Sequence, residues 1–167
     1  MIEYTAKMSK HILLLLGEGG HSKEMLRLAD LLGGDFRYSY VLVRDDEVSA
    51  GKITLPGPIY RVIRPRDKAH NAVLDAAKTA LCALQAVLIL LRAQPDAIIT
   101  TGPGVAVPVC LAARLLRCRI IFIETGSRVH ALSTTGRVVY RFASLFFVQW
   151  EELLAAYPRA IYAGRLW

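Results

Sequence analysis

Residues 12–32 read ILLLLGEGGHSKEMLRLADLL, and this stretch decides the fold class. It opens with an uninterrupted aliphatic run that stops at Gly17, a pattern typical of a strand buried on both faces of a parallel sheet. From Ser22 onward the apolar residues recur at helical spacing, so we expect a helix with Ser22 as its N-cap and a glycine pair at its end. The stretch therefore predicts a strand, a glycine-rich turn and a helix.

The same alternation continues to the end of the chain. We expect further strands at residues 38–43, 59–63, 97–101, 119–123 and 145–149, and helices at 71–92, from 104 to about 117, at 134–144 and at 150–157. Because a right-handed crossover places each helix over one face of the sheet, this order predicts an α/β fold: a single Rossmann-like parallel sheet with helices on both faces. We expect one domain over residues 1–167. Residues 157–167 are expected to be its last strand, or an edge offered to a second chain.

Composition narrows the function classes. The chain has 167 residues, 54% of them hydrophobic, which is ample for one core and excludes disorder. The net charge of +7 favours anionic partners, but no nucleic-acid motif accompanies it, so we expect no nucleic acid. The three cysteines have no metal or disulfide spacing, which favours a reducing cytosol. We expect neither a metal ion nor a cofactor.

The longest uncharged stretches are residues 79–91 and 97–113, and neither satisfies the requirement of roughly 18 apolar residues for a membrane span. A basic loop precedes the predicted helix at 71–92, and basic residues beside an apolar helix suit contact with anionic headgroups. The membrane-contact residues expected from this pairing are Arg61, Arg64, Arg66, Lys68, Leu88 and Leu91. The alternative is a solvated loop before an ordinary core helix.

The glycine-rich turn is the strongest candidate for a binding site. Glycines let backbone N–H groups approach a phosphate, and the N-terminus of the following helix adds positive potential. His21 at the helix start could bind a phosphate or act as a base on a hydroxyl group. The phosphate-binding residues expected here are Gly17, Gly19, Gly20 and Ser22. The alternative is a structural turn with a surface histidine.

This turn also matches part of the dinucleotide fingerprint G-x-G-x-x-G, with Asp45 or Asp46 as a ribose ligand. Ser22 occupies the position of the third glycine, which weakens the match. An NAD(P)-binding Rossmann enzyme is therefore the alternative function.

Two further loops follow predicted strands and should lie at the same sheet edge. After residue 123, Glu124 could orient a sugar hydroxyl or act as the base, and Arg128 could bind a diphosphate through two hydrogen bonds. A structural Glu124–Arg128 ion pair is the alternative. The remaining residues expected to bind acceptor or phosphate are Thr125, Gly126 and Ser127 here and Gly102 and Gly104 in the other loop. For the last two, tight packing between strand and helix is the alternative.

Several motifs occur together and in order across nearly the whole chain. They are Gly17-x-Gly19-Gly20-His21-x-x-Glu24-Met25, Thr101-Gly102-Pro103-Gly104, Glu124-Thr125-Gly126-Ser127-Arg128, Ser133-x-Thr135-Gly136-Arg137, Val148-Gln149-Trp150 and Tyr157-Pro158. In this combination the chain resembles the asparagine-linked-glycosylation protein fourteen family, whose bacterial members include PssD-like and capsular polysaccharide proteins. It departs from the family at Glu18, where serine is usual.

The resemblance implies the N-terminal, acceptor-binding half of a GT-B glycosyltransferase, similar to that half of MurG. The UDP-sugar site would belong to a separate small subunit, similar to the asparagine-linked-glycosylation protein thirteen or PssE family. The two chains would transfer a sugar, with inversion, from a UDP-sugar such as UDP-GlcNAc to a polyprenyl-diphosphate-linked acceptor in oligosaccharide, capsular or exopolysaccharide biosynthesis. His21 or Glu124 would be the catalytic base.

The resemblance also implies that this sugar transfer takes place at the cytoplasmic face of the membrane. Eukaryotic members carry an N-terminal membrane span, whereas residues 1–10 of this chain lean polar. We therefore expect monotopic or peripheral attachment through residues 61–91. A noncatalytic protein that recruits a catalytic partner to the membrane is the other alternative.

Overall fold

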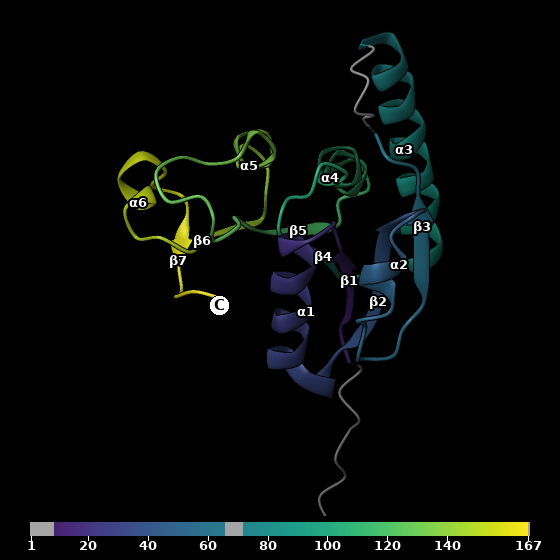
Figure 1. Cartoon of the computed structure of the whole chain (residues 1–167), viewed down its shortest axis with the longest axis horizontal. Coiled ribbons are helices and arrows are strands. Elements are labelled where there is room, and N and C mark those ends of the chain that lie inside the picture. The colour runs from purple at the N-terminus through teal and green to yellow at the C-terminus, as the bar shows by residue number, and fades with distance from the viewer. Residues whose placement is uncertain (1–8, 66–71, 167) are drawn as a thin grey trace, which may run out of the picture.

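The computed structural model describes residues 9–65 and 72–166. They form one parallel sheet in the order β3-β2-β1-β4-β5-β6-β7 (Figure 1). The strands are β1 (His11–Leu15), β2 (Arg37–Val43), β3 (Ile59–Val62), β4 (Ala97–Thr100), β5 (Arg119–Ile123), β6 (Leu145–Val148) and β7 (Ile161–Tyr162). The helices are α1 (Gly20–Leu32), α2 (Glu47–Ala50), α3 (Ala72–Ala93), α4 (Ala106–Leu115), α5 (Thr134–Val139) and α6 (Leu153–Ala156), with a 3-10 turn η1 (Gly33–Asp35) after α1. The predicted fold class is confirmed.

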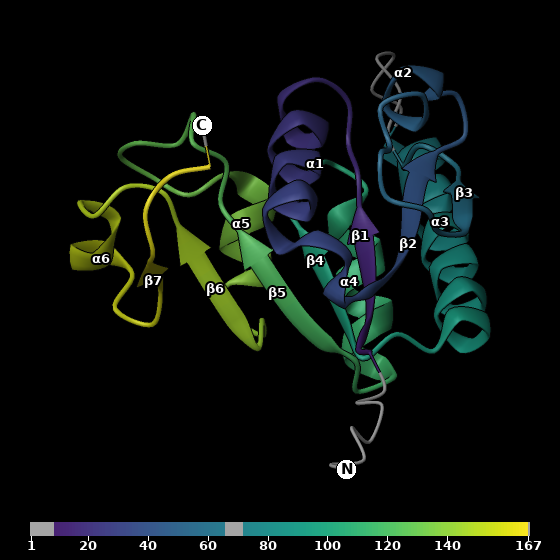
Figure 2. The same cartoon turned by 90° about the horizontal axis from the view of Figure 1, so that it is seen from below.

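The order of the strands reverses at β1, and this reversal positions the site. β1 pairs with β2 on one side and with β4 on the other. The chain leaves β1 through α1 and leaves β4 through α4, and these two helices cover opposite faces of the sheet (Figures 1 and 2). In open parallel sheets ligands bind at the carboxyl ends of the strands, in the crevice that such a reversal opens.

β1 is buried on both faces, as its aliphatic sequence predicts. Leu13 and Leu15 belong to a core that also contains residues of α3, α4 and α5. Leu14 and Leu16 belong to a second core beneath α1. Each fully buried leucine contributes about 1.5–3 kcal/mol relative to an exposed one. Burial on two sides therefore fixes β1, and the glycine turn after it, at the centre of the molecule.

Helix α3 packs on one side only. Cys82, Ala86 and Leu90 face the core, and the helix packs against α4. Its other face exposes Leu81, Leu84, Leu88 and Leu91, each about half accessible to solvent. In Figure 1 the first turns of α3 extend past the sheet.

By length and composition, α3 could cross a membrane, and within residues 9–65 and 72–166 it is the one helix that meets this criterion. This criterion tolerates two charged residues in 18, whereas the requirement applied to the sequence alone was an uncharged stretch. The helix predicted at 71–92 runs over Ala72–Ala93 and includes Asp75 and Lys78, so the stricter requirement is still not met.

Other predicted boundaries also shift. Helix α1 begins at Gly20, so the prediction of Ser22 as its N-cap is wrong: Gly19 turns the chain at φ +67°, and Ser22 lies inside the first turn. The helix predicted at 134–144 ends at Val139, since Ser144 already donates from its N–H to the carbonyl of Ile120 in β5 (2.8 Å). The helix predicted at 150–157 shortens to α6.

The segment after β2 forms the short helix α2, because the Asp46 carboxylate accepts a hydrogen bond from Ser49 N–H (2.9 Å) and caps a single helical turn. At the opposite edge, β7 pairs with β6, so the expectation of a last strand within this domain is confirmed.

Candidate functional site

The loops after β1, β4 and β5 meet at the carboxyl edge of the sheet and enclose two cavities. The first has a volume of about 520 Å³ and the second about 710 Å³. His21 lines both cavities. The structure therefore brings this predicted residue to the wall between the two spaces in which ligands could be held.

The glycine turn allows this arrangement through close backbone approach. A Cβ atom on Gly17 would lie 2.2 Å from the Cβ of Pro103, so only glycine lets the turn after β1 approach the loop after β4. Gly20 and Gly104 have open space where a Cβ would stand, and each lines a cavity. Exposed backbone beside a cavity is what an anion-binding turn requires.

Ser22 does not face the cavities, contrary to its predicted role in phosphate binding. Its side chain is buried and donates to the carbonyl oxygen of Gly17. Its hydroxyl also lies 2.7 Å from that of Ser49, which follows β2. Ser22 therefore holds the turn in place rather than presenting a ligand.

The first cavity extends from the glycine turn toward α3, α4 and α5. Its wall is mostly apolar, with His21, Glu18, Arg64 and three threonine side chains as polar members; it comprises Gly17, Glu18, His21, Val43, Arg64, Pro65, Thr79, Pro103, Gly104, Val105, Val107, Pro108, Thr134, Thr135 and Val138. Thr134 and Thr135 were not predicted to line a site, and the available signal was the motif Ser133-x-Thr135-Gly136-Arg137, in which Thr135 directly precedes the glycine. The wall suits a ligand that is partly hydrocarbon and partly polar.

His21 has the environment of a neutral base. Its Nδ1 atom is buried and has no hydrogen-bond partner among the described residues. Burial lowers the pKa of the imidazole below 6.5, the Glu24 carboxylate and a hydrogen bond with the backbone of Thr101 raise it, and the charge of Arg128 lowers it. The net direction is downward. His21 is therefore mostly neutral at pH 7 and able to accept a proton.

The second cavity lies on the α1 side. Its wall carries the cations Lys23 and Arg27 beside the loop after β5; it comprises Gly20, His21, Lys23, Glu24, Arg27, Thr125, Gly126, Ser127 and Leu166. Neither Lys23 nor Arg27 was predicted. Their spacing of four residues, which places them on one face of α1, was the signal.

Glu24 organises the loop after β5. Its Oε1 atom accepts hydrogen bonds from Gly126 N–H (2.9 Å), Thr125 Oγ1 (3.2 Å) and Gln149 Nε2 (3.4 Å). The Oε1 atom of Gln149 in turn accepts from Leu166 N–H (2.7 Å) near the chain end. One carboxylate on α1 thus joins two loops and, through Gln149, the C-terminal segment.

Glu124 is buried and turned inward. Its Oε2 atom accepts from the N–H (2.9 Å) and hydroxyl (3.1 Å) of Ser133, and its Oε1 from Thr125 N–H (3.1 Å). Burial raises the pKa of this carboxyl group, while the hydrogen bonds from Ser133 and Thr125 and the charge of Arg128 act to lower it. Glu124 lines neither cavity. This geometry favours a role in holding the loop over the predicted role as base.

Two further predicted residues, Gly102 and Arg128, line neither cavity. Gly102 serves packing, since at φ +84° a Cβ atom there would lie 2.5 Å from the ring of Phe122. Arg128 is exposed and lines neither cavity, although its charge acts on both His21 and Glu124. The structural alternative, a Glu124–Arg128 ion pair, is not among those the described residues form.

Two arginines of the predicted membrane-contact set are in ion pairs. Arg61 bonds Glu47 (3.0 Å), and Arg64 bonds Glu18 at the first cavity. Arg66 and Lys68 lie outside the described residues. Within residues 9–65 and 72–166, no three His, Cys, Asp or Glu side chains lie close enough together to hold a metal ion.

Comparison with known proteins settles the family. The model of the family described as "Oligosaccharide biosynthesis protein Alg14 like" matches residues 12–166. The chain belongs to this family. Family membership favours the glycosyltransferase interpretation over the alternative of an NAD(P)-binding enzyme.

Characterised relatives match over most of their length. The chain is 31% identical to the UDP-N-acetylglucosamine transferase subunit ALG14 of Mus musculus, over 97% of this chain and 85% of that protein. The subunit of the same name from Homo sapiens is 30% identical over 99% and 87%, and that of Schizosaccharomyces pombe 33% identical over 93% and 82%. These relatives are named as subunits of a transferase.

Solved structures agree with the fold of this Alg14-like protein. MurG of Acinetobacter baumannii superposes with a TM-score of 0.72 and 21% identity over 86% of this chain, and UDP-N-acetylglucosamine 2-epimerase of Rickettsia bellii with 0.70 and 14% over 95%. The chain spans only 42% and 45% of these two proteins. The Alg14-like chain thus has the fold of about half of such an enzyme, in agreement with the predicted N-terminal half.

Proposed function

We propose that this chain is the acceptor-binding subunit of a two-chain inverting glycosyltransferase that uses a UDP-sugar and a polyprenyl-diphosphate-linked acceptor. The observation that carries the proposal is His21, an imidazole that lines both the apolar and the cationic cavity. The names of the ALG14 relatives support transfer from UDP-N-acetylglucosamine.

The first cavity suits the lipid-linked acceptor. Its wall reaches α3 at Thr79, and the exposed leucines of that helix would meet a membrane surface. The acceptor diphosphate would meet the backbone of Gly17 and Gly104 at the turns, with the N-terminus of α1 adding positive potential. The sugar hydroxyl that reacts would then lie at His21.

In this mechanism the imidazole of His21 takes the proton of the acceptor hydroxyl as the hydroxyl oxygen attacks the anomeric carbon of the donor sugar. The bond between that carbon and UDP breaks on the opposite face, which inverts the configuration. Glu24 is three residues further along α1, and its carboxylate stabilises the imidazolium that forms. UDP leaves with the negative charge of the displaced oxygen.

The donor sugar is expected to bind mainly to a partner chain, because this chain matches less than half of MurG. The second cavity, with Lys23 and Arg27, would face that partner. The test is to capture the tagged chain from membranes of its native cells and identify copurifying proteins by mass spectrometry. Recovery of a small donor-domain chain whose mixture with this protein transfers sugar from a UDP-sugar supports the proposal. Recovery of the chain alone, inactive with every UDP-sugar, contradicts it.

Arg128 is expected to neutralise the acceptor diphosphate. Its charge acts on His21, although its side chain is exposed. We expect Arg128→Ala to raise the KM for the acceptor about tenfold with little change in kcat, since a hydrogen bond to a charged group contributes about 1.5–3 kcal/mol. The measurement is an acceptor titration of the two-chain enzyme. Arg117→Ala, at an exposed arginine on the opposite edge of the sheet, is the matched control. An unchanged KM in Arg128→Ala would reject this role.

We propose that the chain attaches to the cytoplasmic face of a membrane through the exposed face of α3. Leu88 and Leu91 are 60% and 55% exposed on a helix that packs on one side only. Arg61 lies on β3 beside this helix and would approach the headgroups.

Replacing Leu88 and Leu91 together by Glu is expected to lower binding to vesicles of mixed anionic and neutral lipid at least tenfold, because two apolar side chains are lost and two like charges gained. Vesicle sedimentation measures the change. Leu31→Glu is the control, because Leu31 is 69% exposed on α1, which covers the opposite face of the sheet (Figure 1). Equal losses in both variants would show that α3 is not the attachment surface.

A further inference from the structure

Glu18 and Arg64 close the polar end of the first cavity with an ion pair. The Nη1 atom of Arg64 donates to Oε2 of Glu18 (3.1 Å), and Nη2 donates to Oε1, so the pair is bidentate. The two residues come from the turn after β1 and the segment after β3, and both line the cavity. The fork of a guanidinium fits a phosphate as it fits a carboxylate.

The position of Glu18 is unfavourable for an anion-binding turn. Its carboxylate stands between Gly17 and Gly19, beside the backbone that would hold phosphate oxygens. Asp45 and Asp46, which follow β2, also act electrostatically on Arg64. The guanidinium therefore lies among carboxylates, and any anion that enters the cavity competes with Glu18 for it.

From this juxtaposition we propose that Arg64 binds a diphosphate, and that the Glu18 carboxylate occupies its guanidinium until the diphosphate enters. A diphosphate entering the first cavity displaces the Glu18 carboxylate from Arg64 and takes its place on the guanidinium fork. The inference rests on the proposed function, because it adds a ligand to the acceptor site described there. It moves Arg64 from the membrane surface, where the sequence places it, to the wall of the cavity.

The exchange is feasible because the pair is partly exposed. The side chain of Glu18 is 53% accessible and that of Arg64 is 43% accessible. Such pairs contribute little to stability, whereas a diphosphate carries more charge than a carboxylate and offers more acceptor oxygens. A neutral or singly charged ligand lacks this advantage. The ion pair therefore selects for a ligand with a multiply charged headgroup.

The test is binding of inorganic pyrophosphate to the purified full chain by isothermal titration calorimetry. We expect Glu18→Gln to bind pyrophosphate about three- to fivefold more tightly than the unchanged protein, and Arg64→Gln to bind it more weakly by a similar factor. In the double variant the gain from Glu18→Gln should shrink, because the guanidinium that Glu18 occupies is gone.

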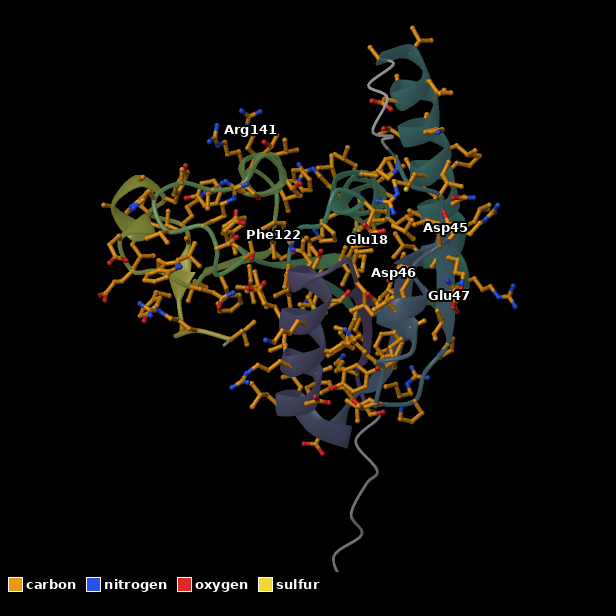
Figure 3. All side chains as sticks on the ribbon, in the orientation of Figure 1. Glu18, Asp45, Asp46, Glu47, Phe122 and Arg141 are labelled. Carbon is orange, nitrogen blue, oxygen red and sulfur yellow. The ribbon has the colours of Figure 1, made fainter. Side chains whose placement is uncertain are left out.

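Glu47→Gln is the matched control. It removes the same charge from the other arginine pair, Arg61–Glu47, which does not line the cavity. Figure 3 labels both residues, Glu18 in the turn before α1 and Glu47 at the start of α2. An equal gain in pyrophosphate affinity in Glu47→Gln would show that the change in net charge alone accounts for the effect, which would overturn the inference. So would a gain from Glu18→Gln that persists undiminished without Arg64.

A second titration uses a short-chain polyprenyl-diphosphate sugar. We expect it to bind more tightly than pyrophosphate and to respond to the same substitutions. If pyrophosphate binds as tightly as the polyprenyl-diphosphate sugar, the site recognises a free diphosphate. That result would overturn the inference that the diphosphate on Arg64 belongs to the lipid-linked acceptor. Sugar transfer by the two-chain enzyme is measured separately. Loss of the predicted pyrophosphate pattern with transfer intact rejects the inference alone, and the pattern without transfer rejects the proposed function.

Discussion

Replacing His21 by Ala is expected to lower the turnover of the two-chain enzyme by about 10²–10⁴-fold, the usual contribution of a positioned general base. The substitution removes the imidazole whose buried Nδ1 atom has no partner among the described residues. The fold should persist, because His21 lines two cavities rather than filling a core. Steady-state transfer from the UDP-sugar measures the loss, and copurification with the partner confirms that the complex still forms.

His130→Ala is the control for this experiment, because His130 is exposed in the loop after β5. The pH profile supplies a second readout. Because burial lowers the pKa of His21 below 6.5, the imidazole stays neutral into mildly acidic solution. The value of kcat/KM should therefore fall only when the pH drops below this lowered pKa. Undiminished turnover in His21→Ala would exclude the imidazole as the base.

Replacing Glu124 by Ala is expected to lower the free energy of unfolding by about 3–5 kcal/mol, since this buried carboxylate accepts three hydrogen bonds whose partly buried donors would lose their partner. Gly136 shows how closely the carboxylate is held, because a Cβ atom there would lie 2.1 Å from Oε2. Urea denaturation of the purified chain measures the change.

Two outcomes separate the structural role of Glu124 from the catalytic one. Glu151→Ala, at an exposed carboxylate, should change the unfolding free energy by no more than about 0.5 kcal/mol. If Glu124→Ala unfolds like the unchanged protein but transfers no sugar, Glu124 is the base after all. If stability falls as expected, the role of Glu124 is to hold the loop through its hydrogen bonds to Ser133 and Thr125.

The sequence was most informative where one local property acts alone. The aliphatic run of β1 has no polar face, so it predicts burial on both sides and therefore a parallel sheet. The helix boundaries were less accurate, because they depend on contacts with distant residues. Ser22 has the chemistry of an N-cap, yet its hydroxyl is bonded to Gly17 and close to that of Ser49, which follows β2.

Periodicity and the order of the motifs were enough to predict the fold class, the family resemblance and the three loops at which to look for a site. Which residues of those loops line a cavity and which hold the loops in place depends on tertiary contacts. His21 borders both cavities, Glu124 turns into the loop, and Arg64 bonds Glu18, which is 46 positions away in the sequence. Hydrogen bonding and burial depend on partners that folding brings together, and no local pattern encodes them.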